Sequence, residues 1–134
     1  MYLDQISVFL ENKPGKLSEF ITLLADNKID LKALSIAETQ DYGVLRIIVD
    51  NPDKTAALLK ERNWPCNKTK VLAVTVPNEP GALTNMLAII AEANISIAYT
   101  YAFTLPEKNS ACIVLRVSDN EAVINLLKKN GIEA

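Results

Sequence analysis

The sequence predicts an α+β fold of two βαββαβ modules in tandem, each an antiparallel sheet with both helices on one face. Two observations indicate it. A Pro-Gly loop occurs twice, and Pro14 and Pro80 lie 66 positions apart in the 134-residue chain. Each loop follows an alternating apolar stretch and precedes an apolar stripe at helical spacing, so a whole supersecondary unit is repeated.

Each element of the first module has its own signal. Residues 5–10 alternate with a period of two, which predicts a half-buried strand. Residues 17–24 carry apolar side chains at helical spacing, and Asn27-Lys28 ends that helix. Strands are expected at 31–38 and 44–49 with a turn at 41–43. Asp50-Asn51-Pro52-Asp53 predicts the next helix start, because it offers a capping side chain, proline and an acid. A fourth strand is expected from Trp64.

The second module repeats this order. Strands are expected at 71–76, 95–103 and 111–117 and helices at 83–93 and 121–129, leaving 131–134 for its fourth strand. A three-residue insertion near Pro106 would align Asp50-Asn51 with Asp119-Asn120. We therefore expect eight strands and four helices in two ferredoxin-like domains, 1–67 and 68–134. Residues 68–72 should run directly from one into the other and make a rigid pair.

Composition narrows the function classes. Hydrophobic residues make up 49% of the chain and charged residues 22%, as in folded globular proteins. A formal net charge of −2 disfavours a phosphate-tracking nucleic-acid partner. No signal peptide or membrane span is expected, which places the protein in the cytoplasm. The chain has no histidine, which removes Ser-His-Asp and Cys-His catalysis. Cys66 and Cys112 are expected to be packed thiols, and no metal or cofactor is expected.

The repeated motifs resemble the ACT domain in both copies. Asn12-Lys13-Pro14-Gly15-Lys16-Leu17 and Asn78-Glu79-Pro80-Gly81-Ala82-Leu83 carry the match, as do residues 25–30 and 91–96. The resemblance covers nearly the whole chain and is closest to stand-alone tandem ACT proteins. It implies a non-enzymatic, allosteric regulatory protein that binds an amino acid and controls an enzyme of amino-acid metabolism. It also implies paired domains with ligands held between them, and thus a homo-oligomer.

The resemblance also implies the ligand-binding residues. In the first copy they are Asn12, Pro14, Gly15, Lys16, Leu17 and Asp30, and in the second copy Asn78, Gly81, Ala82, Leu83 and Ser96. Glycine lets a ligand approach the backbone, and a helix start offers N–H groups to a carboxylate. Asp30 can meet an ammonium whereas Ser96 can only hydrogen-bond it, so the first site is expected to be the better one. Leu10 and Val76 replace a histidine of serine-binding members, which favours an apolar or aromatic amino acid.

Other interpretations remain open at this level. The Pro-Gly loops can be simple turns stabilised by asparagine. Acylphosphatases share the βαββαβ order but need a loop arginine, which neither copy has. RRM domains share it too, but residues 44–49 and 113–117 lack their aromatic side chains. The main alternative is a ligand-free assembly subunit of a metabolic enzyme complex.

Overall fold

The computed structural model describes residues 1–38 and 41–133. The chain forms two compact units with separate hydrophobic cores. The N-terminal unit comprises Asp4–Lys70, and the C-terminal unit comprises Met1–Leu3 together with Val71–Ala134. The sequence-predicted domains, 1–67 and 68–134, stay a prediction about which pieces fold independently.

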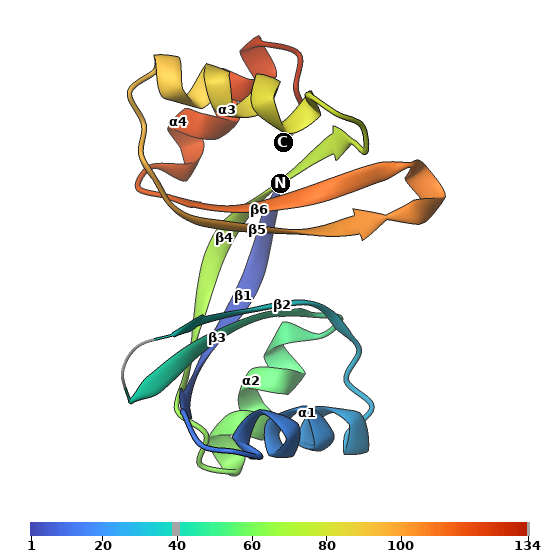
Figure 1. Ribbon diagram of the computed structural model, residues 1–134, viewed down its shortest axis with the longest axis vertical. Helices are drawn as coiled ribbons and strands as arrows, with labels where there is room; N and C mark the ends of the chain where they lie inside the picture. The colour runs from blue at the N-terminus through green and yellow to red at the C-terminus, as the bar shows by residue number, and fades with distance from the viewer. Residues whose placement is uncertain (39–40, 134) are drawn as a thin grey trace. The chain divides into compact units, whose positions relative to one another are not determined.

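The N-terminal unit has the predicted order of elements. Strand β1 (Tyr2–Glu11) leads to helix α1 (Lys16–Asp26), strands β2 (Leu31–Glu38) and β3 (Tyr42–Val49), helix α2 (Pro52–Glu61) and strand β4 (Cys66–Pro77). Strand β3 lies between β2 and β1, and both pairings are antiparallel. Helices α1 and α2 cover one face of this sheet (Figure 1). The predicted turn at 41–43 is wrong for two of its residues, because Tyr42 and Gly43 belong to β3; residues 39–40 lie outside the described chain.

The core of this unit lies between the sheet and the two helices. Ile6, Val8 and Leu10 of β1 face Phe20 and other apolar side chains of the helices, as the period of two predicts. A β-bulge between Leu31 and Ala33 changes the alternation in β2. It sets Leu31 on the same face as Leu34 and Ile36, whereas strict alternation predicts opposite faces. Leu34 and Ile36 remain 48% and 43% exposed on this edge strand.

The C-terminal unit repeats the plan. Its elements are helix α3 (Ala82–Glu92), strand β5 (Ile97–Leu105), the short 3-10 helix η1 (Pro106–Lys108), strand β6 (Ser110–Val117) and helix α4 (Asn120–Lys129). Strand β6 pairs with β4 and β5, and α3 and α4 lie on one face (Figure 1). The expected insertion near Pro106 forms η1. Tyr99, Tyr101 and Phe103 are half-buried on the other face, in register with Arg116, Val114 and Cys112.

The prediction of eight strands is wrong, because two long strands each serve both units. The hydrogen-bonded order is β2-β3-β1-β4-β6-β5. The expected fourth strand of the first copy and the first strand of the second are one strand, β4. Residues 131–133 form no strand; instead the beginning of β1 lies beside β4, where the Ala73 N–H donates to the Met1 carbonyl at 2.8 Å. Each unit thus completes its sheet with a segment from a distant part of the sequence.

The repeat register is also corrected at the second helix of each copy. The side chain of Asn51 accepts from the Lys54 N–H at 3.1 Å, and that of Asp119 accepts from the Ala122 N–H at 3.0 Å. Asn51 therefore aligns with Asp119, and Asp50 is not the cap. Its carboxylate accepts from the Asp30 N–H at 3.2 Å and holds β2 to the end of β3. None of the helices in the described part of the chain is long and apolar enough to cross a membrane.

Candidate functional site

The two Pro-Gly loops have the same backbone hydrogen bonds. In the first, the Lys16 N–H donates to the Lys13 carbonyl at 3.3 Å, and in the second the Ala82 N–H donates to the Glu79 carbonyl at 3.4 Å. These bonds close type II turns, with proline and then glycine at the two central positions. Gly15 has φ 85° and Gly81 has φ 90°, a conformation that other residues adopt only with strain. The loops are thus turns, as one interpretation of the sequence has it, and they also position a helix start.

A helix begins directly after each turn, and backbone N–H groups in its first turn have no acceptor among the described residues. Gly15 and Gly81 are the N-caps of α1 and α3, and neither makes a side-chain cap. The N–H groups of Leu17 and Ser18 donate to no acceptor in the described part of the chain. A Cβ placed on either glycine would meet no atom within 4 Å, so the space before both helices is open. Such a helix start favours a carboxylate, through both its N–H groups and its dipole.

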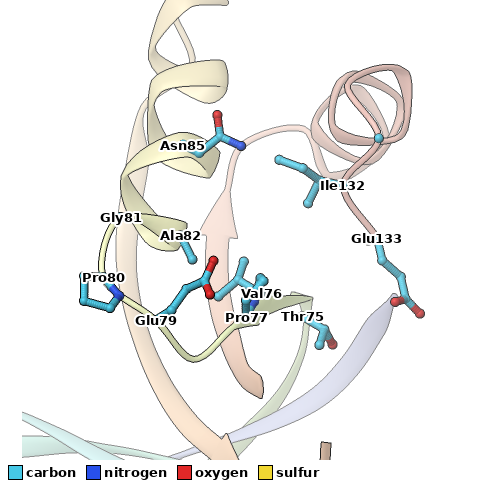
Figure 2. A pocket seen from close by; sticks show the side chains of 11 residues that line it. Thr75, Val76, Pro77, Glu79, Pro80, Gly81, Ala82, Asn85, Ile132 and Glu133 are labelled. Carbon is cyan, nitrogen blue, oxygen red and sulfur yellow. The ribbon is translucent and has the colours of Figure 1, made fainter. Parts of the chain in front are cut away.

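A pocket of about 580 Å³ lies beside the second loop. Figure 2 shows it between the loop, the start of α3 and the segment that follows α4. Of the sequence-predicted residues, Gly81 and Ala82 line it, whereas Asn78 and Leu83 do not. The Glu79 carboxylate and the Asn85 amide are its polar groups beside the helix, and Ile132 closes the opposite wall (Figure 2).

An equivalent but smaller pocket of about 340 Å³ lies beside the first loop. Lys16 lines it, but Asn12, Pro14, Gly15 and Leu17 do not. Asn12 and Asn78 are exposed, and each donates its backbone N–H across the sheet end, to Asp41 and to Asn109 respectively. The more spacious pocket is therefore in the second copy, although the sequence favours the first as the binding site.

Asp30 and Ser96 do not share a pocket with the loops of their own units. The first loop follows the end of β1, where Glu11 pairs with Tyr42 at the beginning of β3. Asp30 lies at the other end, where its carbonyl accepts from the Asp50 N–H at 3.1 Å. The eight residues of β3 separate these ends by roughly 24 Å at about 3.4 Å per residue, too far for one amino acid to bridge. The same holds for Ser96, which precedes β5 at the far end of β6 from Asn78.

Charged groups around the first loop form short-range pairs. Lys13 Nζ lies 2.9 Å from Glu11 Oε2, and Lys16 Nζ lies 3.6 Å from Glu19 Oε2. The hydrogen bond and charge of Lys13 lower the pKa of the Glu11 carboxyl, and the same hydrogen bond raises the pKa of Lys13. Both side chains are largely exposed, so solvent screens the pair.

Several residues that line the two pockets are absent from the sequence-based prediction. They follow the second helix of each copy: Arg62, Asn63, Trp64 and Pro65 in the first, and Gly131, Ile132 and Glu133 in the second. The prediction assigned the residues from Trp64 onward and residues 131–134 to fourth strands. The chain reverses after each helix, where Asn63 and Gly131 have φ 61° and 75° and bring the next residues back beside the loops.

The chain is similar to several solved structures, and no curated protein matches it. Protein BT0572 from Bacteroides thetaiotaomicron is 40% identical with a TM-score of 0.91, over 99% of this chain and 91% of that chain. The regulatory subunit of aspartate kinase from Thermus thermophilus is 13% identical with a TM-score of 0.62, over 94% and 91%. The model of the family described as ACT domain pair matches residues 1–133. The chain therefore belongs to the ACT domain pair family, as the resemblance of its two Pro-Gly motifs implies.

Proposed function

We propose that the chain is a non-catalytic regulatory protein that binds an apolar or aromatic amino acid at its Pro-Gly loops and modulates an enzyme of amino-acid metabolism. The observation that carries the proposal is the open helix start behind each type II turn. The Leu17 and Ser18 N–H groups have no acceptor in the described chain, and a Cβ on Gly15 would meet no atom within 4 Å. A ligand carboxylate placed there would receive N–H hydrogen bonds and the favourable end of the α1 dipole.

The remaining residues of the proposed site act around that carboxylate. Asn12 would orient it through its side-chain amide, which is exposed beside the turn. Pro14 fixes the turn, and Lys16 and Leu17 contribute the first turn of α1. Asp30 would meet the ammonium only from a module of a second chain, because in its own unit it lies at the far end of β3. A homo-oligomer is therefore part of the proposal.

The second site would use Asn78, Gly81, Ala82 and Leu83 with Ser96 from a second chain. Its pocket is the larger of the two, but Ser96 offers no charge to an ammonium. We therefore keep the first loop as the stronger amino-acid site. The regulatory role draws support from a shared fold alone: the similar Thermus thermophilus protein is named as a regulatory subunit.

A thermal-shift screen of the twenty amino acids tests the proposal. A ligand that binds only the folded chain adds about 2.7 kcal/mol of stability at about 100 times its Kd. The matching amino-acid amides, which lack the carboxylate, should give no shift. If none of the twenty raises the melting temperature, the chain does not sense an amino acid, and the ligand-free assembly subunit becomes the better explanation.

A further inference from the structure

Trp64 is the only tryptophan of the chain, and its ring is held beside open space. Its backbone N–H donates to the Leu59 carbonyl at 2.8 Å, and its ring packs edge to face on Phe20 with 5.3 Å between the centroids. The residue nevertheless stays half-buried. Three separate hollows of the N-terminal unit are lined by Trp64. A partly exposed aromatic residue therefore borders several hollows of this unit.

One of these hollows, the 340 Å³ pocket beside the first loop, is aromatic. We call it the aromatic pocket and define it by Phe9, Tyr42, Trp64, Lys16 and Arg62. Phe9 is 46% exposed and Tyr42 is 55% exposed, unusual values for such large apolar side chains. The Phe9 N–H donates to the Pro65 carbonyl at 3.2 Å and so holds the two walls together. The volume lies at the lower end for ligand pockets, which suits a molecule the size of an amino acid.

The pocket also contains one cation without a partner. Glu11 pairs with Lys13, and Glu19 pairs with Lys16. The Arg62 guanidinium makes no hydrogen bond or ion pair with any residue of the described chain. A guanidinium binds a carboxylate through two parallel hydrogen bonds, so Arg62 is suited to an anionic group on a ligand.

The internal repeat shows that the same fold can be built with other side chains at these positions. The second copy builds the same turn, helix start and pocket from different residues. By strand register and by the helix ends, Thr75 replaces Phe9, Ser110 replaces Tyr42, and Ile132 replaces Trp64. Ala82 replaces Lys16, and Asn130 replaces Arg62. Since the same fold forms with either set of side chains, the stability of the fold alone does not explain why the first copy has aromatic and basic groups at these positions.

We propose that the aromatic pocket binds a small molecule consisting of one aromatic ring that bears a carboxylate. The ring would lie against Trp64 and Phe9, and the carboxylate would meet Arg62 at the end of α2. This inference rests on the proposed function, because Lys16 belongs to both sites, but it assigns the ligand class and new binding residues. Free aromatic acids and aromatic amino acids share this chemistry, and the experiment separates them.

Titration of Trp64 fluorescence tests the proposal, since emission from this chain reports on one residue. Phenylacetate should change the emission saturably. Phenylacetamide, which lacks the charge, and acetate, which lacks the ring, should not change it at the same concentrations. Arg62→Asn, which installs the residue of the second copy, should weaken phenylacetate binding on the order of tenfold or more, and Arg62→Lys should weaken it less. Lys129→Asn removes an exposed cation from α4, outside the pocket, and should leave the affinity unchanged.

The same titration is then carried out with phenylalanine. If it also binds, and binding depends on Arg62, the natural source is an amino acid; if only phenylacetate binds, it is an aromatic acid without the amino group. The inference would be overturned if amino acids stabilise the chain without changing Trp64 emission and stabilise the Arg62→Asn variant equally. The proposed function would then still hold. Arg62-dependent phenylacetate binding without any amino-acid binding would support the pocket and remove the proposed function. No response to any aromatic acid would overturn the inference.

Discussion

At the scale of single residues, the two turn glycines and the two loop asparagines have different tasks. Gly15 is required by the backbone, because its φ of 85° lies in the left-handed region. Asn12 is not required by the backbone, since its N–H bond to the Asp41 carbonyl is available to any residue except proline. Substitutions at these positions should therefore separate stability from binding.

Gly15→Ala should lower the free energy of unfolding by about 1–2 kcal/mol, through backbone strain alone, since a Cβ there meets nothing within 4 Å. Urea unfolding of the variant measures this. Gly43→Ala is the control, because Gly43 has no positive φ and its added Cβ would make only ordinary contacts, with the Ile36 side chain at 3.4 Å and the Ala37 carbonyl at 4.0 Å. Equal losses at both positions would contradict the assignment of strain to Gly15.

Asn12→Ala should weaken amino-acid binding about 10- to 150-fold, because loss of a hydrogen bond to a charged group costs about 1.5–3 kcal/mol. Calorimetry with the ligand found in the screen measures the change. Asn78→Ala should have a smaller effect, since Ser96 supplies no charge at the second site. Unchanged affinity in Asn12→Ala would remove Asn12 from the site without affecting the aromatic pocket.

The site was only partly predictable from the sequence, for reasons visible in single residues. Pro14 and Gly15 predict a turn and a helix start, because proline followed by glycine is typical of a type II turn. Arg62 and Trp64 carry no such signal, since they lie on either side of Asn63, whose positive φ reverses the chain after α2. Comparison of the two copies at these positions, which are basic and aromatic in the first and uncharged and non-aromatic in the second, is the signal that could have found them.

At the scale of elements, the helix starts follow local rules while strand partners do not. Asn51 and Asp119 cap α2 and α4 through bonds to residues three positions later, so their role can be read from sequence. The sequence-based alignment of Asp50 with Asp119 was wrong by one position because Asp50 and Asn51 are both good caps. The bulge in β2 and the pairing of the beginning of β1 with β4 depend on distant residues, which a local pattern does not contain.

Asn51→Ala and Asp119→Ala should each lower the free energy of unfolding by about 1 kcal/mol, because each leaves an N–H of its helix without the side-chain acceptor. Chemical unfolding of each variant measures the loss. Asn125→Ala, at an exposed position within α4, removes an amide of the same size without removing a cap and should not destabilise. Destabilisation by Asn125→Ala equal to that by Asp119→Ala would exclude the capping explanation.

At the scale of the whole molecule, each compact unit needs a segment that the repeat boundary does not assign to it. Met1–Leu3 belong to the C-terminal unit although they precede the first copy. A fragment cut at the sequence boundary, 68–134, would expose the edge of β4 that β1 covers. An uncovered strand edge loses hydrogen bonds and invites association.

Deletion of residues 1–3 should therefore destabilise the C-terminal unit more than the N-terminal unit. Hydrogen exchange resolved by residue measures this, with faster exchange expected in the Val71–Pro77 part of β4 than in β3. Triple substitution of Met1, Tyr2 and Leu3 by alanine is the control, since it keeps the backbone bond to Ala73. Uniform exchange changes across both units would show that Met1–Leu3 are not a specific part of one of them.

The chain should also form oligomers, as the proposed use of Asp30 by a second chain requires. Leu34 and Ile36 are exposed on the edge strand β2 and offer apolar surface to a partner. Light scattering at micromolar concentration should give a mass above the 14.7 kDa of one chain. A mass equal to a single chain would contradict the shared site while leaving each pocket within its own unit.

The pairing of Met1 with Ala73 also sets an order of events during synthesis. The ribosome makes Tyr2 and Leu3 about 70 residues before the part of β4 that they lie beside. At roughly 5–20 residues per second, these side chains wait several seconds for their partner. Meanwhile residues 4–70 can collapse around Phe20 and Leu24, so Met1–Leu3 reach their final place only after the residues that follow them have begun to fold.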